Sequence, residues 1–139
     1  MADRLTPARR SWLMSRVGAK NTSAEMRVRS AAHARGLRYR IHRKDLFGTP
    51  DIVFPKWRIA VFVHGCFWHR HPGCKKATMP KSRVDFWKQK FDHNVARDRA
   101  NVAALEAAGW QVEIIWECET KSQEALSARL ERVFGAPDA

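Results

Sequence analysis

Acidic, imidazole and thiol side chains gather in residues 51–74, which read DIVFPKWRIAVFVHGCFWHRHPGC. Asp51 directly precedes an apolar run at 52–54, and a second apolar run at 59–63 leads into His64. Both runs are short, rich in β-branched and aromatic residues, and bounded by Pro or Gly, which is typical of strands that are buried on both faces. We therefore expect the chemistry of this protein at the ends of two central strands.

Three cysteines and two histidines of the chain could bind a metal ion: Cys66, His69, His71, Cys74 and Cys118. An odd number of cysteines beside histidines favours metal binding over a disulfide framework. Four sulfur and nitrogen ligands with no open position predict a tetrahedral zinc ion that stabilises the fold. The cysteines would supply three ligands, and spacing alone leaves open whether His69 or His71 supplies the fourth. The alternative is three unrelated buried cysteines.

Asp51 could serve a magnesium-dependent phosphodiesterase, because in such an enzyme the metal bridges a carboxylate to the scissile phosphate. His64 and His69 flank the same turn, and either imidazole could act as a general base or donate a hydrogen bond to a phosphate. Each residue also has an ordinary explanation. Asp51 could end its loop with an Asx turn, and each histidine could be a surface or core residue.

The length and charge of the chain narrow its class. Its 139 residues suit one domain whose core needs no disulfides. The 26 lysines and arginines exceed the 14 acidic residues, which gives a formal net charge of +12. This charge implies a polyanionic partner, and we favour nucleic acid because no stretch resembles a membrane helix or a cationic anchor. The N-terminus lacks the apolar core of a signal peptide, so we expect a cytoplasmic protein without membrane contact.

Aromatic side chains lie among these ligand and basic residues. Phe67 and Trp68 would either pack over the metal-binding loop or insert between bases, where stacking contributes about 1–3 kcal/mol per base. Trp87, in a segment rich in lysine and arginine, is a third candidate for such a wedge. Trp87 would equally suit the apolar face of an amphipathic helix.

The remaining sequence predicts the elements that position these groups. Residues 1–20 surround a small apolar group with basic side chains, which predicts a partly helical basic arm, or alternatively a solvated tail, ahead of a domain at 21–139. Thr22 and Glu25 form a capping box that starts a helix. The expected elements are a helix over 22–35 closed by Gly36, an outer strand over 37–42, strands over 52–54 and 59–63, a helix from an N-cap at Ser82 to 108 with a break near 92–94, a strand over 110–116 and a helix over 122–134. This order predicts an α/β domain with a four-stranded mixed sheet.

Several of these residues belong to a longer pattern: Asp51, VFVHGCFWH at 61–69, DFW at 85–87, Asn94-Val95 with Arg97-Asp98-Arg99, and Gly109-Trp110 with Trp116-Glu117-Cys118. Together they resemble the very short patch repair (Vsr) DNA mismatch endonucleases over nearly the whole chain. The resemblance implies a restriction-endonuclease-like single domain, its central four-stranded mixed sheet flanked by helices, with a structural zinc site. It also implies magnesium-dependent nicking of double-stranded DNA beside the thymine of a T·G mismatch that arises by deamination of 5-methylcytosine. A monomer and cooperation with mismatch-repair proteins are further expectations.

The same resemblance implies roles for single residues. Asp51 is similar to the magnesium ligand, with Val63 contributing its backbone carbonyl. His69 is similar to the general base, which leaves zinc to Cys66, His71, Cys74 and Cys118. The supporting catalytic residues would be Glu25, His64 and Asp98. The residues implied in DNA binding are Phe67, Trp68 and Trp87 in the major groove, and Met14 of the arm in the minor groove.

One departure from a wider pattern limits these assignments. The Pro50-Asp51 strand also resembles the PD-(D/E)xK nuclease superfamily, but His64-Gly65-Cys66 stands where a Glu-x-Lys would follow. The superfamily mechanism therefore supplies no base here, and the assignment of His69 depends on the narrower family. Two alternatives to a mismatch endonuclease are a zinc-stabilised nucleic-acid-binding module without catalysis and an endonuclease that cleaves DNA without a mismatch.

Overall fold

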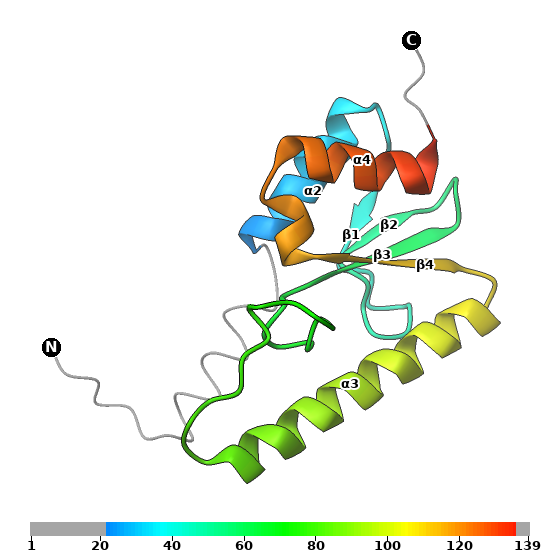
Figure 1. The fold of residues 1–139 in the computed structure, drawn as a ribbon. Helices are drawn as coiled ribbons and strands as arrows, with labels where there is room; N and C mark the ends of the chain where they lie inside the picture. The colour runs from blue at the N-terminus through cyan, green and yellow to red at the C-terminus, as the bar shows by residue number, and fades with distance from the viewer. Residues whose placement is uncertain (1–21, 136–139) are drawn as a thin grey trace, which may run out of the picture.

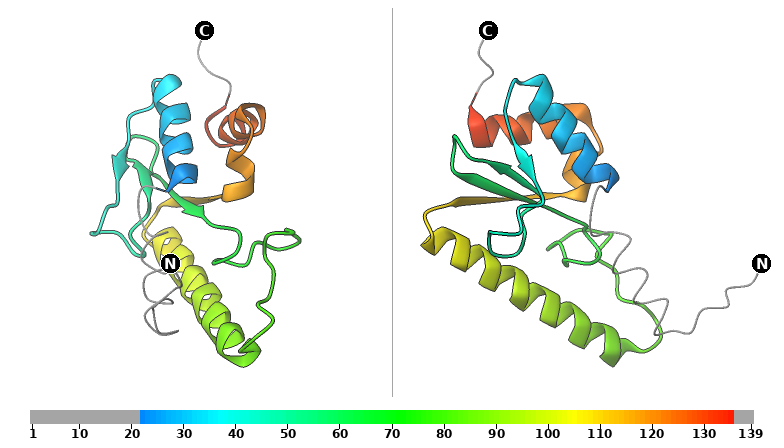
Figure 2. Two further views of the ribbon diagram at one scale, coloured as in Figure 1. Left: turned by 90° about the vertical axis from the view of Figure 1, so that its left-hand side faces the viewer. Right: turned by 180° about the vertical axis from the view of Figure 1, so that it is seen from behind.

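The computed structural model describes residues 22–135, so the N-terminal arm and Met14 lie outside the described residues. In the described part, helix α2 (Ser23–Ala34) and helix α4 (Gln123–Phe134) cover one face of a sheet, and helix α3 (Val84–Ala107) crosses the other (Figures 1 and 2). This three-layer arrangement confirms the predicted α/β domain. No helix within 22–135 is both long enough and apolar enough to span a membrane.

The sheet contains strands β1 (Arg40–Ile41), β2 (Ile52–Phe54), β3 (Ile59–His64) and β4 (Gln111–Trp116), in that spatial order. The pairs β1–β2 and β2–β3 are antiparallel, whereas β3–β4 is parallel, so the sheet of the described residues is mixed as predicted. A parallel pair needs a long crossover connection. Here that connection consists of the loop 65–83 and helix α3.

Strand β3 supplies both halves of the core. Ile59 and Val61 face α2 and α4, where they pack with Phe54 and other buried residues. Ala60 and Phe62 face the opposite side and pack around Leu105 of α3. Because successive side chains of a strand point to opposite faces, a strand between two helical layers must be apolar throughout, which accounts for its continuous apolar run.

Three predictions about these elements are wrong. The helix expected to break near 92–94 is continuous from Val84 to Ala107, because its sequence contains neither Pro nor Gly to interrupt it. Ser82 is not its cap; Arg83 takes that place in a left-handed conformation (φ 54°) without a side-chain hydrogen bond. The strand expected over 37–42 is reduced to Arg40–Ile41, because β2 offers pairing partners only to these two residues.

The other predicted termini are confirmed. The Thr22 hydroxyl accepts a hydrogen bond from the Glu25 amide at the start of α2, and the Ser122 hydroxyl accepts one from Ala125 at the start of α4. Gly36 and Gly135 follow the ends of these helices with φ angles of 76° and 82°. Local hydrogen bonding therefore set these boundaries, as the sequence indicated.

The loop 42–49, which precedes Asp51, is pressed against helix α3. Gly48 has a φ angle of 75°, and a Cβ atom at this position would lie 2.7–2.8 Å from the side chain of Asn101. Such distances are far below van der Waals contact. Only glycine allows the loop to lie this close to α3, and the loop in turn places Asp51.

We predict that Gly48→Ala destabilises the fold more than Gly36→Ala. Both glycines have nearly the same φ angle, 75° and 76°, but nothing lies within 4 Å of a Cβ atom at Gly36. The shared backbone strain costs about 1–2 kcal/mol, so the difference between the two variants measures the clash with Asn101. Urea unfolding should give the larger loss for Gly48→Ala, and Asn101→Ala should remove only part of the excess, because the Cβ atom of residue 101, at 2.8 Å, remains. Equal losses would mean that the loop is free to move away from α3.

Candidate active site and metal site

A pocket of about 1050 Å³ opens where β3 ends, between the loop 42–49 and helix α3. Its wall contains six of the predicted site residues: Asp51, Val63, His64, Trp68, His69 and Asp98. Basic side chains, among them Lys44, Lys90 and Arg97, line the same pocket. The structure thus brings together residues from the sheet, a loop and a helix, next to side chains that attract an anion.

The Asp51 carboxylate is held by the central strand. The backbone N–H of Val63 donates a hydrogen bond to Asp51 Oδ2 at 2.8 Å. Burial raises the pKa of Asp51 to about 7, and the nearby charge of Glu25 adds to this effect, whereas the Val63 amide, His42 and His69 oppose it. The described residues therefore compensate an ionised Asp51 only in part, a condition that favours binding of a cation.

His69 and Asp98 form a tightly bonded pair. His69 Nδ1 lies 2.6 Å from Asp98 Oδ2. Burial alone would raise the pKa of Asp98, but the hydrogen bond and charge of His69 hold it below the ordinary value. A carboxylate on one imidazole nitrogen orients the ring and stabilises its charged form, which leaves Nε2 to exchange a proton with another molecule.

His64 stacks on His69, with ring centroids 3.8 Å apart and an angle of 7° between the planes. Burial, followed by the charges of His69 and Arg97, lowers the pKa of His64 to about 3. His64 Nδ1 is buried and has no hydrogen-bond partner among the described residues. His64 is thus a neutral imidazole at physiological pH that keeps a hydrogen-bonding atom available.

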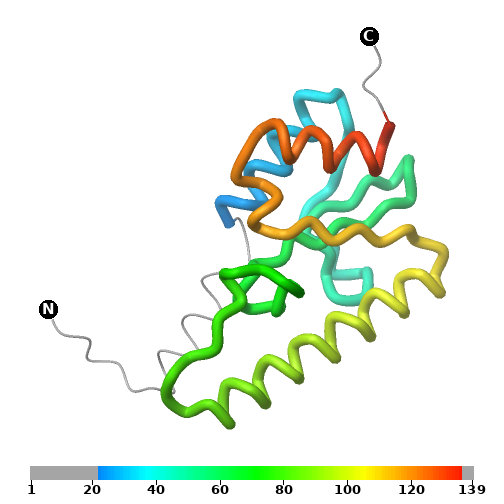
Figure 3. The backbone as a smooth tube through the Cα atoms, in the orientation of Figure 1, coloured from blue at the N-terminus to red at the C-terminus, as the bar shows by residue number. Residues whose placement is uncertain are grey.

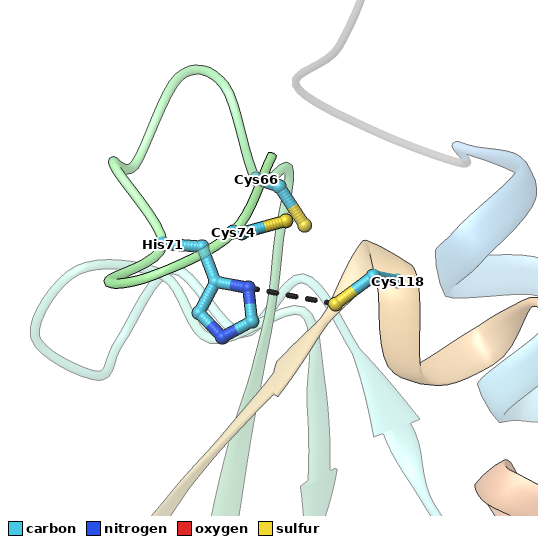
Figure 4. Close-up of side chains that lie close together, drawn as sticks. All are labelled: Cys66, His71, Cys74 and Cys118. Atoms are coloured by element: carbon cyan, nitrogen blue, oxygen red, sulfur yellow. Dashed lines mark hydrogen bonds between the residues drawn. The ribbon is translucent and has the colours of Figure 1, made fainter. Parts of the chain in front are cut away.

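A second cluster lies beside the pocket. The ligand atoms of Cys66, His71, Cys74 and Cys118 all lie within 4.8 Å of one another, and their side chains point toward a common centre (Figure 4). Burial raises the pKa of Cys66 to about 12, so a cation is needed to hold this sulfur as a thiolate. His69 lies apart from this group and pairs with Asp98 instead. The four clustered residues could hold one metal ion.

The loop 65–83 carries most of this chemistry although it contains no helix or strand. Figure 3 shows a green segment that first curls near the orange turn after β4 and then runs on as an extended stretch to the start of α3. The Arg70 guanidinium donates hydrogen bonds to the carbonyl oxygens of Phe67, Ala77 and Thr78, which ties the first residues of the loop to its middle. Side-chain bonds and the cysteine–histidine cluster therefore replace regular backbone hydrogen bonding here.

The three predicted DNA-binding aromatics lie together on α3 and the neighbouring loop. The Phe67 and Trp68 rings are 5.0 Å apart, and Trp68 is 5.9 Å from Trp87. All three are partly exposed, and Lys90 Nζ lies 5.6 Å from the Trp68 ring. They pack on one another and still present aromatic surface beside the active-site pocket, so the structure accommodates both interpretations made from the sequence.

Sequence reasoning missed His42 and explained Glu25 incompletely. Only half of the predicted capping box forms: the Thr22 hydroxyl accepts from the Glu25 amide, whereas the Glu25 carboxylate bonds to His42 and Arg29. His42 lines the pocket. No local signal could have identified it, because its partner Glu25 lies 17 residues away in another element.

Known proteins with similar sequences identify the family of this chain. A family model described as DNA mismatch endonuclease Vsr matches residues 2–76. The DNA mismatch endonuclease Vsr of Escherichia coli strain K12 is 40% identical over 136 residues, which cover 94% of this chain and 86% of that protein. The chain belongs to the Vsr family.

Other Vsr relatives are named as nicking enzymes. The type II nicking enzyme V.XorIIP of Xanthomonas oryzae pv. oryzae is 54% identical over 134 residues, covering 96% of this chain and 98% of that protein. The type II nicking enzyme V.NmeAIP of Neisseria meningitidis is 41% identical over 133 residues, covering 96% and 94%. Membership of the Vsr family makes this chain a DNA-cleaving hydrolase, and it agrees with the restriction-endonuclease-like fold expected from the sequence.

We predict that Asp51→Asn stabilises this Vsr-family protein, and more so at pH 8 than at pH 5.5. The folded pKa of about 7 lies above the ordinary 3.8, so Asp51 lowers stability increasingly as pH rises from about 4 to 7 and constantly above it. Removing an ionised buried carboxylate should therefore gain on the order of a few kcal/mol at pH 8. Urea unfolding in buffer free of magnesium and of chelators measures this difference.

Asp45→Asn is the matched control for this experiment. The Asp45 carboxylate is exposed, and the hydrogen bond from Arg43 keeps its pKa below the ordinary value. An acid with a lowered pKa is favourable when ionised, so its removal should not stabilise the protein at either pH. A gain for Asp51→Asn that is equal at both pH values, or a loss at pH 8, would contradict the electrostatic account of Asp51.

Proposed function

We propose that this protein nicks one strand of duplex DNA beside the thymine of a T·G mismatch, in the presence of Mg²⁺. The observation that carries the proposal is the buried Asp51 carboxylate, which shares one pocket with the His69–Asp98 pair. Phosphodiester hydrolysis needs an anionic metal ligand and a base within reach of one phosphate. The family and the nicking relatives support this assignment.

Asp51 and the backbone carbonyl of Val63 would hold Mg²⁺. A hard cation prefers oxygen ligands. Its positive charge would also stabilise the ionised form of the buried Asp51 carboxylate, whose pKa is raised to about 7. When bound, Mg²⁺ would neutralise phosphate charge and lower the pKa of a water molecule. The basic pocket residues Lys90 and Arg97 would then contact the DNA backbone.

His69 would act as the general base. Its Nδ1 is occupied by Asp98, so Nε2 would take the proton from the attacking water, and the carboxylate would stabilise the imidazolium that results. His64 stacks on the His69 ring and stays neutral because its pKa is about 3. Because the His64 ring is neutral, it places no positive charge beside His69 that would oppose proton uptake by that ring. We therefore assign His64 a supporting role.

Zinc would be held by Cys66, His71, Cys74 and Cys118, with no open position. Three thiolates and an imidazole suit tetrahedral zinc, and the four ligand atoms are already grouped. The ion would fix the loop between Cys66 and Cys74, which carries His69. Zinc therefore has a structural role in this proposal, distinct from that of Mg²⁺.

Phe67, Trp68 and Trp87 would enter the major groove beside the mismatch. Their partly exposed rings adjoin the pocket, and a wedge between base pairs is least costly where pairing is already weak. One pocket suffices for one nick, so we propose a monomer that then passes the nicked DNA to mismatch-repair proteins.

Nicking of end-labelled duplexes tests the central proposal. We expect a single magnesium-dependent nick on the thymine strand of a T·G duplex, none in the matching C·G duplex, and a loss of at least about a thousandfold in Asp51→Asn, because the metal contributes several kcal/mol. Binding of both duplexes without cleavage would leave a zinc-stabilised binding module. Equal cleavage of both duplexes would indicate an endonuclease that ignores the mismatch.

Zinc content separates the two histidines that spacing left open. We expect one zinc ion per wild-type chain, retained in His69→Ala and lost in His71→Ala and Cys118→Ser, with a lower melting temperature only where zinc is lost. Elemental analysis and thermal unfolding of purified proteins measure both quantities. Full zinc occupancy and wild-type stability in Cys118→Ser would overturn the proposed site.

A further inference from the structure

The Glu25 carboxylate is buried and has two partners on different elements. Glu25 is 1% exposed. Arg29, one turn further along α2, donates to Oε2 at 2.9 Å. His42, directly after β1, contacts the same carboxylate through Nε2, at 2.9 Å from Oε2 and 3.2 Å from Oε1. Arg29 thus holds Glu25 from its own helix, whereas His42 holds it from the side of the sheet.

His42 is joined to Asp51 as well. The backbone N–H of His42 donates to the carbonyl oxygen of Asp51 at 3.1 Å. His42 has a φ angle of 48°, a left-handed conformation that is unfavourable for a residue with a Cβ atom. This conformation ends strand pairing after Ile41 and is accompanied by two bonds, one from the backbone to Asp51 and one from the side chain to Glu25. A disfavoured backbone held at a pocket wall points to a functional constraint.

Glu25, His42 and Asp51 act as one electrostatic group. One ligand atom from each lies within 4.8 Å of the others. Glu25 is close enough to raise the pKa of Asp51, and His42 is close enough to lower it. His42 is part of the pocket wall, whereas Glu25 lies behind it. The charge of Glu25 therefore acts on the pocket next to the carboxylate that we assign to Mg²⁺.

We infer that His42 is a positioning residue, which holds the Glu25 carboxylate toward Asp51 so that a divalent cation meets two negative charges. This inference rests on the proposed magnesium site at Asp51. Without His42, Glu25 keeps Arg29 as its partner, and an i,i+4 pair of this kind draws the carboxylate along its own helix. The Glu25 carboxylate would then lie farther from the cation, although every residue assigned to catalysis is still present.

Binding of Mn²⁺ to the zinc-loaded protein without DNA tests the inference, with the signal of free Mn²⁺ followed by electron paramagnetic resonance. We expect His42→Ala to weaken binding about tenfold, as expected for a charge-assisted hydrogen bond lost. His42→Gln should restore most of the affinity, because its amide N–H can donate to Glu25. His33→Ala, which removes an exposed histidine of α2, is the matched control and should bind as the wild type does.

A double-mutant cycle asks whether His42 acts through Glu25. In a Glu25→Gln background, His42→Ala should cost no further affinity, because the charge that it positions is already gone. An undiminished effect in that background, or His42→Gln binding as weakly as His42→Ala, would overturn the inference and leave His42 as a direct contact. Melting temperatures of the His42 variants should stay near that of their parent protein, wild type or Glu25→Gln, if the role is positional.

A further variant, His42→Asn, and a nicking assay at varied Mg²⁺ concentration complete the test. If His42→Ala does not fold, His42→Asn replaces it, because the shorter amide cannot reach Glu25 and should bind Mn²⁺ more weakly than His42→Gln. Nicking of a T·G duplex at increasing Mg²⁺ should show the same rank order in the concentration needed for half-maximal rate. Mn²⁺ binding that depends on His42 in a protein that nicks no duplex would refute the proposed function and retain the role of His42. Nicking of the T·G duplex together with unchanged Mn²⁺ binding in the His42 variants would retain the proposed function and refute the role of His42.

Discussion

The burial of one carboxylate, Asp51, is the constraint on which the rest of the site depends. A carboxylate in such a place is unfavourable when ionised, and its pKa of about 7 expresses that cost. The central strand offsets part of it with the Val63 amide, at 2.8 Å. The remaining negative charge would attract a cation, so the property that lowers the stability of the fold is the one that would suit Asp51 to the metal-binding role that we propose for it.

Two carboxylate–histidine pairs flank Asp51, and they come from opposite layers of the fold. Asp98 and His69 belong to α3 and the loop 65–83, below the sheet in Figure 1, whereas Glu25 comes from α2 above it and its partner His42 follows β1. The pocket therefore exists only when both helical layers are packed on the sheet. Packing of apolar residues around β3 on each face is what brings the two pairs to one place, so core and site depend on the same strand.

The sequence predicted those features that have a local cause. Continuous apolar runs identified β2 and β3, and side-chain caps at Thr22 and Ser122 set the starts of two helices. Features that depend on distant partners were missed or misjudged. The first strand begins only at Arg40, because β2 pairs with no residue before it. His42 contacts Glu25, which belongs to another element. The fold class could be read from local patterns, whereas the polar network around Asp51 required the tertiary structure.

The parallel register of β3 and β4 explains how Cys118, 52 residues after Cys66, joins the ligands of the loop 65–83. His64 pairs with Trp116, so Cys66 and Cys118 each follow two residues after paired positions and leave the sheet side by side. The same register stacks His71 on Trp116, with centroids 4.3 Å apart, and His69 on His64. A metal ion at the four ligands would thus fasten the loop to the strand ends that carry its neighbours, and would hold His69 in place without any regular structure in the loop itself.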